Sequence, residues 1–295
     1  MAILLSLITS ILWAIFDVVR KKIILFLDVK IVIFLIALSQ SILFVAFLFF
    51  SEFKFAFKDY FVFGVLLLIL NIFSIYCFLI VIKKGEISTY IPMLSFTPLF
   101  SAFYAQIILN EVLVFRQYMG ILFIILGALL LHSNNFKAKS LIISPILFLK
   151  NKNSYLIIIV ALIWSLTPVL DKECMKYTDL YLHGFLQSFG MFVLVFLIYR
   201  RKLKKFLSIT LYSSYNINEL MLVIFLIFVG FLCTFFQLLS LKYNMVAELE
   251  ALKRAVGVIL SLIFGFYFFK EKIKINKIIS VFVILLGVVN TTNFT

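Results

Sequence analysis

Four charged residues stand close together in one long apolar stretch, residues 246–269: Glu248 near its start, and Glu250, Lys253 and Arg254 farther in. If this stretch is a helix that crosses a membrane, each charge costs about 2.5–3.5 kcal/mol on insertion scales and needs a partner or a function. Residues three and four positions apart are neighbours on a helix, so Glu250 reaches both cations. One carboxylate cannot neutralise two cations. Two interpretations therefore stay open, an internal ion pair or a binding site for an anionic group that Lys253 and Arg254 hold.

Other polar and aromatic residues lie in further apolar stretches, where lipid would not favour a polar group. Asp17 follows Trp13 by four positions on the same helix face, and it is a candidate for gating or for carrying a coupling proton. Its alternative is an ion pair with Arg20 or with another buried cation. We predict that four more residues contact a substrate in the interior: Trp13, Trp164, Tyr90 and Gln237. Their alternatives are an interfacial position for tryptophan and hydrogen bonds to neighbouring helices for the others.

Residue patterns that would indicate an enzyme are absent from the sequence. His132 and His183 are isolated, lie near the ends of apolar stretches and have no neighbouring pattern of metal ligands. Asp171 and Glu173 end another stretch, and we expect both to be solvated. No glycine-rich phosphate loop or nucleophile motif is present, so we expect no enzyme, no metal and no cofactor. An integral-membrane enzyme is the remote alternative.

The composition explains where these charges must reside. Hydrophobic residues make up 65% of the 295 residues, whereas soluble domains are nearer one half, so lipid is the solvent that fits the chain. A spanning helix needs roughly 20 apolar residues. The apolar stretches that meet this length lie near residues 2–19, 29–50, 60–82, 87–110, 116–133, 155–172, 180–199, 218–241, 246–269 and 274–291. The net charge of +14 is scattered between these stretches, so we expect no nucleic-acid partner.

An internal repeat relates the two halves of the chain. A shift of 160 residues aligns Glu111 with Glu271, Ile124 with Ile284, Leu126 with Leu286, and Gly127 with Gly287. The starts of the halves also match, since the segment containing Trp13 resembles the one containing Trp164. Five spans per half is an odd number, so the second copy enters the membrane inverted. We therefore predict an all-α integral membrane protein of ten transmembrane helices, built as two inverted five-helix repeats (1–133 and 155–295) joined by residues 134–154.

The distribution of basic residues predicts the orientation of the chain. The loops after odd-numbered spans hold 19 of the 27 Lys and Arg residues. By the positive-inside rule these loops are cytoplasmic, which places both termini outside. Loops at equivalent positions of the two halves therefore differ in their content of basic residues and lie on opposite sides of the membrane, as an inverted repeat requires.

The ten-span plan, the tryptophans Trp13 and Trp164 that open each half, and the pair Glu111 and Glu271 resemble the drug/metabolite transporter superfamily, EamA type. The resemblance is clearest at 76–130 and 236–290. It implies a ten-helix bundle around a central cavity, alternating access, and cytoplasmic termini, the last in conflict with the charge distribution. Lys253 and Arg254 look like the Lys-Arg pair of the triose-phosphate and nucleotide-sugar branch, which implies that they bind substrate phosphate.

These observations together predict a secondary-active transporter in the plasma (bacterial inner) membrane. We expect it to move a small organic metabolite with an anionic group, a carboxylate or a phosphate, with Lys253, Arg254 and Glu250 at the binding site. The alternative substrate is an amino acid or an amphipathic compound. Coupling to protons and coupling by exchange both stay open, and we expect a monomer whose partners are its small-molecule substrate and the lipid bilayer.

Overall fold

The structure is a computed structural model that describes residues 1–84, 90–132, 152–210, 216–270 and 275–291. These residues are helical apart from short connections and one isolated β-bridge between Phe55 and Thr178. The long helices are α1 (Ala2–Ile23), α2 (Val29–Phe47), α3 (Phe57–Lys84), α8 (Lys152–Cys174), α9 (Leu180–Thr210), α10 (Ile217–Tyr243) and α11 (Val246–Phe269). The shorter ones are η1 (Leu48–Phe50), η2 (Pro92–Phe96), α5 (Thr97–Leu109), α6 (Phe115–His132) and α12 (Ile275–Thr291).

Within the described residues, seven helices are long and apolar enough to cross a membrane. Shorter apolar helices cover Met93–Leu109, Phe115–Leu130 and Ile278–Thr291. The all-α membrane class predicted from the composition is confirmed at this level. The predicted segment 134–154 and Glu271 lie almost wholly outside the described residues.

Local sequence signals set several helix boundaries. Asp28 caps α2, because its carboxylate accepts a hydrogen bond from the Lys30 amide at 2.9 Å. Partial burial of Asp28 opposes its ionisation, but hydrogen bonds from Lys202 and from that amide hold its pKa below the ordinary value. Proline lacks an amide hydrogen, and Pro92 and Pro98 accordingly begin η2 and α5 and divide the predicted stretch 87–110.

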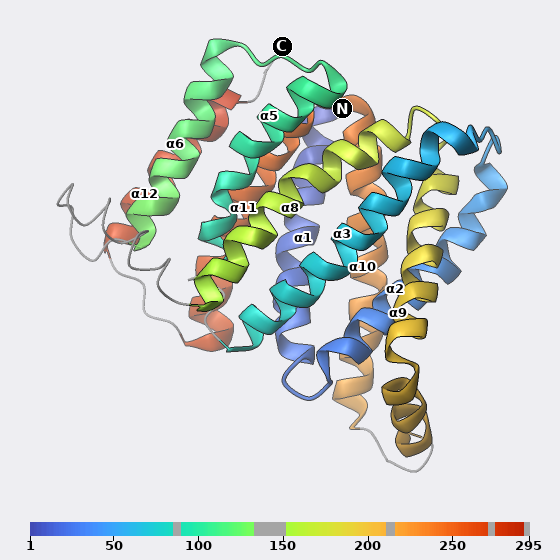
Figure 1. The fold of residues 1–295 in the computed structure, drawn as a ribbon. Helices are drawn as coiled ribbons and strands as arrows, with labels where there is room; N and C mark the ends of the chain where they lie inside the picture. Colours follow the sequence, from blue (N-terminus) through green and yellow to red (C-terminus); the bar gives the residue numbers. More distant parts are fainter. Residues whose placement is uncertain (85–89, 133–151, 211–215, 271–274, 292–295) are drawn as a thin grey trace.

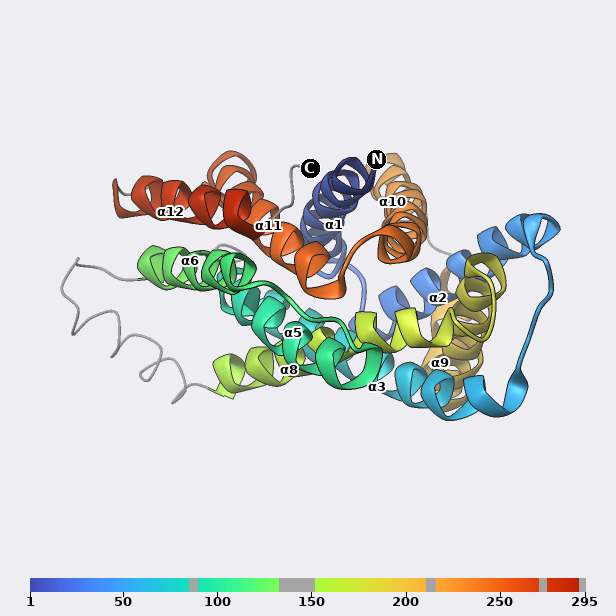
Figure 2. The ribbon, with the colours of Figure 1, turned by 90° about the horizontal axis from the view of Figure 1, so that it is seen from above.

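The helices pack in a pattern that the two halves share. α1 packs against α10 and α11, and α8 packs against α3 and α5. α2 packs against α9 at one flank of the bundle, and α6 packs against α12 at the other (Figures 1 and 2). α1 begins at the end of the bundle where α8 finishes, so these two helices run in opposite directions (Figure 1). The end of α12 lies at that same end as the start of α1.

Glycines allow α6 and α12 to approach each other closely. A Cβ atom added to Gly127 would lie 2.6 Å from the Ile284 side chain and 2.9 Å from the Ser280 carbonyl oxygen. A Cβ atom added to Gly287 would lie 2.7 Å from the Ile124 side chain and from the Gly120 carbonyl oxygen. The residues that the 160-residue shift aligns therefore contact each other reciprocally across this helix pair.

Candidate functional site

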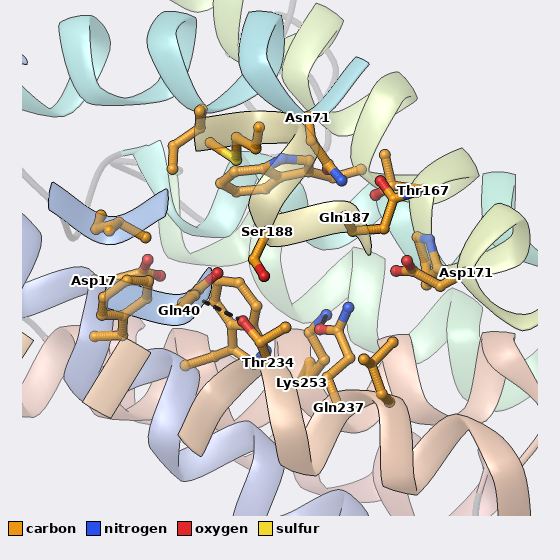
Figure 3. Close-up of a pocket in the computed structure, with 18 of the residues that line it drawn as sticks. Asp17, Gln40, Asn71, Thr167, Asp171, Gln187, Ser188, Thr234, Gln237 and Lys253 are labelled. Carbon is orange, nitrogen blue, oxygen red and sulfur yellow. Dashed lines mark hydrogen bonds between the residues drawn. The ribbon is translucent and has the colours of Figure 1, made fainter. Parts of the chain in front are cut away.

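A cavity of about 160 Å³ lies between α1, α2, α3, α8, α9, α10 and α11 (Figure 3). Its charged lining residues among those described are Asp17, Arg20, Asp171, Lys253 and Arg254. Asp17 and Asp171 lie at opposite sides of the cavity, with Gln237 and Lys253 between them in the view of Figure 3. The helices that carry this lining come from both halves of the chain.

One wall of the cavity is formed by the ion pairs of α11. Glu250 is fully buried, and its two carboxylate oxygens contact Lys253 Nζ at 2.5 Å and an Arg254 terminal nitrogen at 3.2 Å. Lys253 Nζ also donates to Gln237 Oε1 at 2.9 Å, and Arg254 Nε donates to Thr97 Oγ1 at 2.8 Å. Lys253 and Arg254 face the cavity, whereas Glu250 lies behind them. The internal ion pair that the spacing predicted is therefore present, and both cations still border the open space.

The two tryptophans connect this wall to a third cation. Lys253 Nζ lies 5.2 Å from the centre of the Trp13 ring, and Arg254 Cζ lies 5.9 Å from the centre of the Trp164 ring. Arg20 is 1% exposed, and its Cζ atom lies 5.5 Å from the Trp13 ring and 6.0 Å from the Trp164 ring. A cation within about 6 Å of an aromatic ring centre is attracted by the ring quadrupole. The equivalent tryptophans of the two halves thus bring three cations to one region of the cavity.

Arg20 forms an ion pair with Asp17 on the same helix, three positions away. This is the alternative that the sequence left open for Asp17 beside a coupling or gating role, and the coupling role stays a prediction. The burial of Arg20 was not predicted, because it opens a run of three basic residues that resembles a cytoplasmic anchor. Trp13 Nε1 and Arg20 Nε are buried without a hydrogen-bond partner among the described residues.

A chain of hydrogen bonds forms the opposite wall. His183 is fully buried; its Nε2 atom lies 3.0 Å from Asp171 Oδ1, and its Nδ1 atom lies 3.0 Å from the Tyr60 hydroxyl oxygen. Gln187 Nε2 donates to the same hydroxyl oxygen at 3.0 Å. Asp171 is 9% exposed and Glu173 6%, so the expectation that both are solvated is wrong. α8 extends to Cys174, two residues past the predicted end of its span, and both carboxylates lie within it in the packed bundle.

Glu111 lies at the start of a helix that is far from it in the sequence. Its carboxylate accepts a hydrogen bond from the Val246 amide at 2.8 Å and contacts Lys172 Nζ at 2.6 Å. The negative charge therefore faces the positive end of α11, the helix that carries the Lys253–Arg254 pair. Lys172 also donates to the Asn244 carbonyl oxygen at 2.7 Å, which fixes the turn before α11.

The structure places most of the predicted site residues around the cavity, but Tyr90 does not line it. The predicted residues that line the cavity are Trp13, Asp17, Trp164, Gln237, Lys253 and Arg254. Tyr90 is buried at 7% exposure and is not among the residues that line this cavity. Sequence reasoning missed Arg20, Asp171, His183 and Gln187. The sequence signal for Arg20, Asp171 and His183 was their position near the ends of apolar stretches, and for Gln187 it was a polar residue inside one.

The sequence model of the EamA-like transporter family matches residues 1–133 and 152–292, which is nearly the whole chain in two segments. This protein belongs to the EamA-like transporter family. That family is part of the drug/metabolite transporter superfamily, so the resemblance of the sequence is confirmed. The protein is accordingly a multi-pass membrane transporter of small molecules and not a member of an enzyme family.

A solved structure described only as a crystal structure of a protein shares the fold of this EamA-family chain. The two are 14% identical with a TM-score of 0.69, and the match covers 99% of this chain and 97% of that one. At this identity the similarity concerns the fold alone. The comparison with curated proteins found no match.

Proposed function

We propose that this EamA-family protein is a secondary-active transporter that moves a small organic metabolite carrying a carboxylate or a phosphate by alternating access. The observation that carries the proposal is the position of Lys253 and Arg254, which border the cavity and share the single carboxylate of Glu250. Arginine can grip an anionic group with two parallel hydrogen bonds, while lysine acts as a compact charge. Because both cations border the open space, an anion in the cavity can contact them directly while Glu250 stays paired behind them.

Unused hydrogen-bond donors support an anionic ligand. Trp13 Nε1 and Arg20 Nε are buried without a partner among the described residues, and both side chains line the cavity. A buried donor that lacks a partner costs about 1–3 kcal/mol. The oxygens of a carboxylate or phosphate accept several hydrogen bonds and relieve this cost, whereas an ammonium group has no acceptor to offer.

The size of the cavity supports a small substrate. Its volume is about 160 Å³, whereas pockets for drug-sized ligands occupy about 300–1,000 Å³. The cavity suits a metabolite of a few heavy atoms in this state of the protein. Nucleotide-sugars are therefore disfavoured relative to small carboxylates and phosphates.

The same proposal includes ten spans arranged as two inverted five-helix repeats, residues 1–133 and 155–295, in the plasma membrane. The reciprocal packing of α1 and α8, their opposite directions and the paired contacts of α6 with α12 support it. In this arrangement the three shorter apolar helices also cross the membrane. Inverted repeats place a substrate site at their interface, and the cavity is lined by helices of both halves. We propose a monomer, because both halves of the repeat lie in one chain.

A zwitterionic amino acid is the second candidate substrate. Asp171 lies across the cavity from Asp17, and it offers a carboxylate to an ammonium group while Lys253 and Arg254 hold the carboxylate of the ligand (Figure 3). This candidate requires Asp171 to exchange its bond to His183 for the ligand. The experiment below separates the two candidates.

The test is a thermal-stability screen of the purified protein with pyruvate, glycerol 3-phosphate, alanine and choline. A ligand at one hundred times its Kd stabilises the folded state by about 2.7 kcal/mol. We expect stabilisation by pyruvate or glycerol 3-phosphate, its loss in Lys253→Ala/Arg254→Ala, and its retention in Arg200→Ala/Arg201→Ala. The control pair removes the same charge from exposed positions within α9. Stabilisation by choline alone, or equal stabilisation of both double variants, would contradict an anion site on α11.

A further inference from the structure

The hydrogen-bonded chain Asp171–His183–Tyr60 is not used by the proposed anion site, although it faces the same cavity. Its three members come from α8, α9 and α3, and Asp171 and His183 line the cavity. His183 is fully buried and both of its ring nitrogens have a partner. A histidine with both nitrogens occupied, one of them by a carboxylate, is a group that can hold or release one proton without moving.

The donor and acceptor pattern describes a neutral imidazole. Gln187 Nε2 donates to the Tyr60 oxygen at 3.0 Å, which leaves the Tyr60 hydrogen free to donate to His183 Nδ1. The remaining imidazole hydrogen then lies on Nε2 and is donated to Asp171. Every hydrogen in this chain has an acceptor. A proton added to Nδ1 turns the Tyr60 oxygen into an acceptor from both neighbours, and the Tyr60 hydrogen then turns away from His183.

The charges around the cavity explain when that proton is taken up. Among the described residues, the cavity wall and the ion pair behind it hold three cations and three carboxylates: Arg20, Lys253, Arg254, Asp17, Asp171 and Glu250. With a neutral His183 these charges balance. An anionic substrate adds one uncompensated negative charge to a low-dielectric site, where such a charge is strongly disfavoured. Protonation of His183 restores the balance.

We propose that His183, held by Asp171 and Tyr60, carries one proton together with each anionic substrate molecule. This inference rests on the proposed anion transport. The proton enters from water on the side from which the substrate binds, resides on the imidazole while the site is closed, and leaves to water on the other side with the substrate. A monovalent anion and one proton then cross together with no net charge moved.

The surroundings of His183 favour it over Asp17 as the proton carrier. The titratable and charged groups around His183 are Asp171 and Cys174 on α8, Tyr60 on α3, Asp179 at the start of α9, and Lys253 across the cavity on α11. Asp171 stabilises an imidazolium directly, and Lys253 is engaged by Glu250 and Gln237. Asp17 is bound to Arg20, so its protonation would leave a buried arginine without its partner.

The first experiment follows the imidazole itself. The chain contains 2 His, so ¹⁵N-histidine NMR of the full-length His132→Gln protein in detergent reports on His183 alone. We expect a neutral Nε2–H imidazole without ligand at neutral pH, and an increased protonated fraction when pyruvate or glycerol 3-phosphate is added at the same pH. If an anion stabilises the protein but does not change the protonation of His183, the inference is overturned and anion binding still stands.

The second experiment counts protons by calorimetry in buffers of different ionisation enthalpy. We expect about one proton more to be taken up per anion by the wild type than by His183→Gln, a difference that isolates the histidine whichever anion binds. Linkage then weakens anion binding to the wild type by up to about tenfold for each unit of increase in pH wherever binding takes up one proton. Asp171→Asn should reduce this pH dependence.

The outcomes separate the two proposals. Tight anion binding with equal proton uptake in wild type and His183→Gln overturns the proton carrier and retains the anion transporter. If neither pyruvate nor glycerol 3-phosphate binds, the proposed function fails and this inference fails with it. If His183→Gln does not fold, the NMR response of the wild-type imidazole decides.

Discussion

Glu250 is completely buried, whereas its partners Lys253 and Arg254 border the cavity. Its two carboxylate oxygens contact one cation each. Replacing one partner of a buried ion pair by a neutral group leaves the other charge without compensation. Here the removal of one carboxylate would expose two cations to each other. The group is therefore asymmetric, and the loss of Glu250 should affect stability and ligand binding in opposite directions.

We expect Glu250→Gln to lower the free energy of unfolding by about 3–5 kcal/mol, the range found when one partner of a buried ion pair is removed. An anion should then stabilise the variant more than the wild type, because the ligand replaces the lost negative charge. Thermal unfolding with and without pyruvate or glycerol 3-phosphate measures both effects. A variant as stable as the wild type would show that Lys253 and Arg254 are solvated and not buried beside Glu250.

The matched control for this change is Glu52→Gln. Glu52 contacts Lys54 at 2.5 Å, but both side chains are largely exposed to solvent. Exposed ion pairs contribute about 0–1 kcal/mol, so this variant should unfold close to the wild-type temperature. The comparison holds the chemical change constant and varies only burial.

At the residue scale, contacts between residues of the same helix could be predicted from their spacing, whereas contacts between different helices could not. The intervals of three and four residues from Glu250 to Lys253 and Arg254 predicted the ion pairs that the structure contains. His183 looked isolated because its partner Tyr60 is 123 residues away in the chain. Arg20 looked like part of a basic anchor because sequence alone does not say which face of a helix end is buried.

At the scale of the elements, the contact between α6 and α12 depends on two glycines at equivalent positions of the repeat. The atoms that a methyl group at Gly127 would meet include the Ser280 carbonyl oxygen, and at Gly287 they include the Gly120 carbonyl oxygen. Backbone atoms cannot turn aside as a flexible side chain can. Small residues at membrane helix interfaces allow this close packing.

We expect Gly127→Ala and Gly287→Ala each to destabilise the protein by about 1–3 kcal/mol, the typical cost of overpacking. Gly257→Ala is the control, because the nearest atom to an added Cβ there lies 3.9 Å away, an ordinary contact distance. Thermal unfolding of the three variants without ligand provides the measurement. Equal stability of all three would mean that α6 and α12 lie farther apart than the structure has them.

The repeat signal in the sequence was most informative for this helix pair. The 160-residue shift aligned Ile124 with Ile284 and Gly127 with Gly287, and these four residues contact one another in the structure. The sequence did not reveal that Glu111 caps α11. The reason is that a carboxylate in a turn is compatible with any nearby helix start, and only the packing selects one. The stretch 87–110 was predicted as one span, and the sequence did not reveal the 3₁₀ turn of η2 that divides it.

At the scale of the whole molecule, the two ends of the helix bundle differ in charge. Arg20, Lys21 and Lys22 end α1, and Lys83 and Lys84 end α3. These ends lie opposite the end at which α1 begins and α12 finishes (Figure 1). The charge bias read from the sequence therefore follows the geometry of the bundle. It predicts termini outside the cell, whereas the family resemblance predicts termini in the cytoplasm.

Labelling of introduced cysteines from one side of the membrane decides between these two orientations. The native cysteines Cys77, Cys174 and Cys233 are all buried, so a membrane-impermeant maleimide should find little background. Glu52 and Leu25 are both exposed, in connections at opposite ends of the bundle. Basic loops are retained in the cytoplasm during insertion, so Glu52→Cys should react in intact cells and Leu25→Cys only after permeabilisation. The reverse pattern would place both termini in the cytoplasm. In that case the proton on His183, which lies towards the Glu52 end, would exchange first with the cytoplasm instead of the exterior.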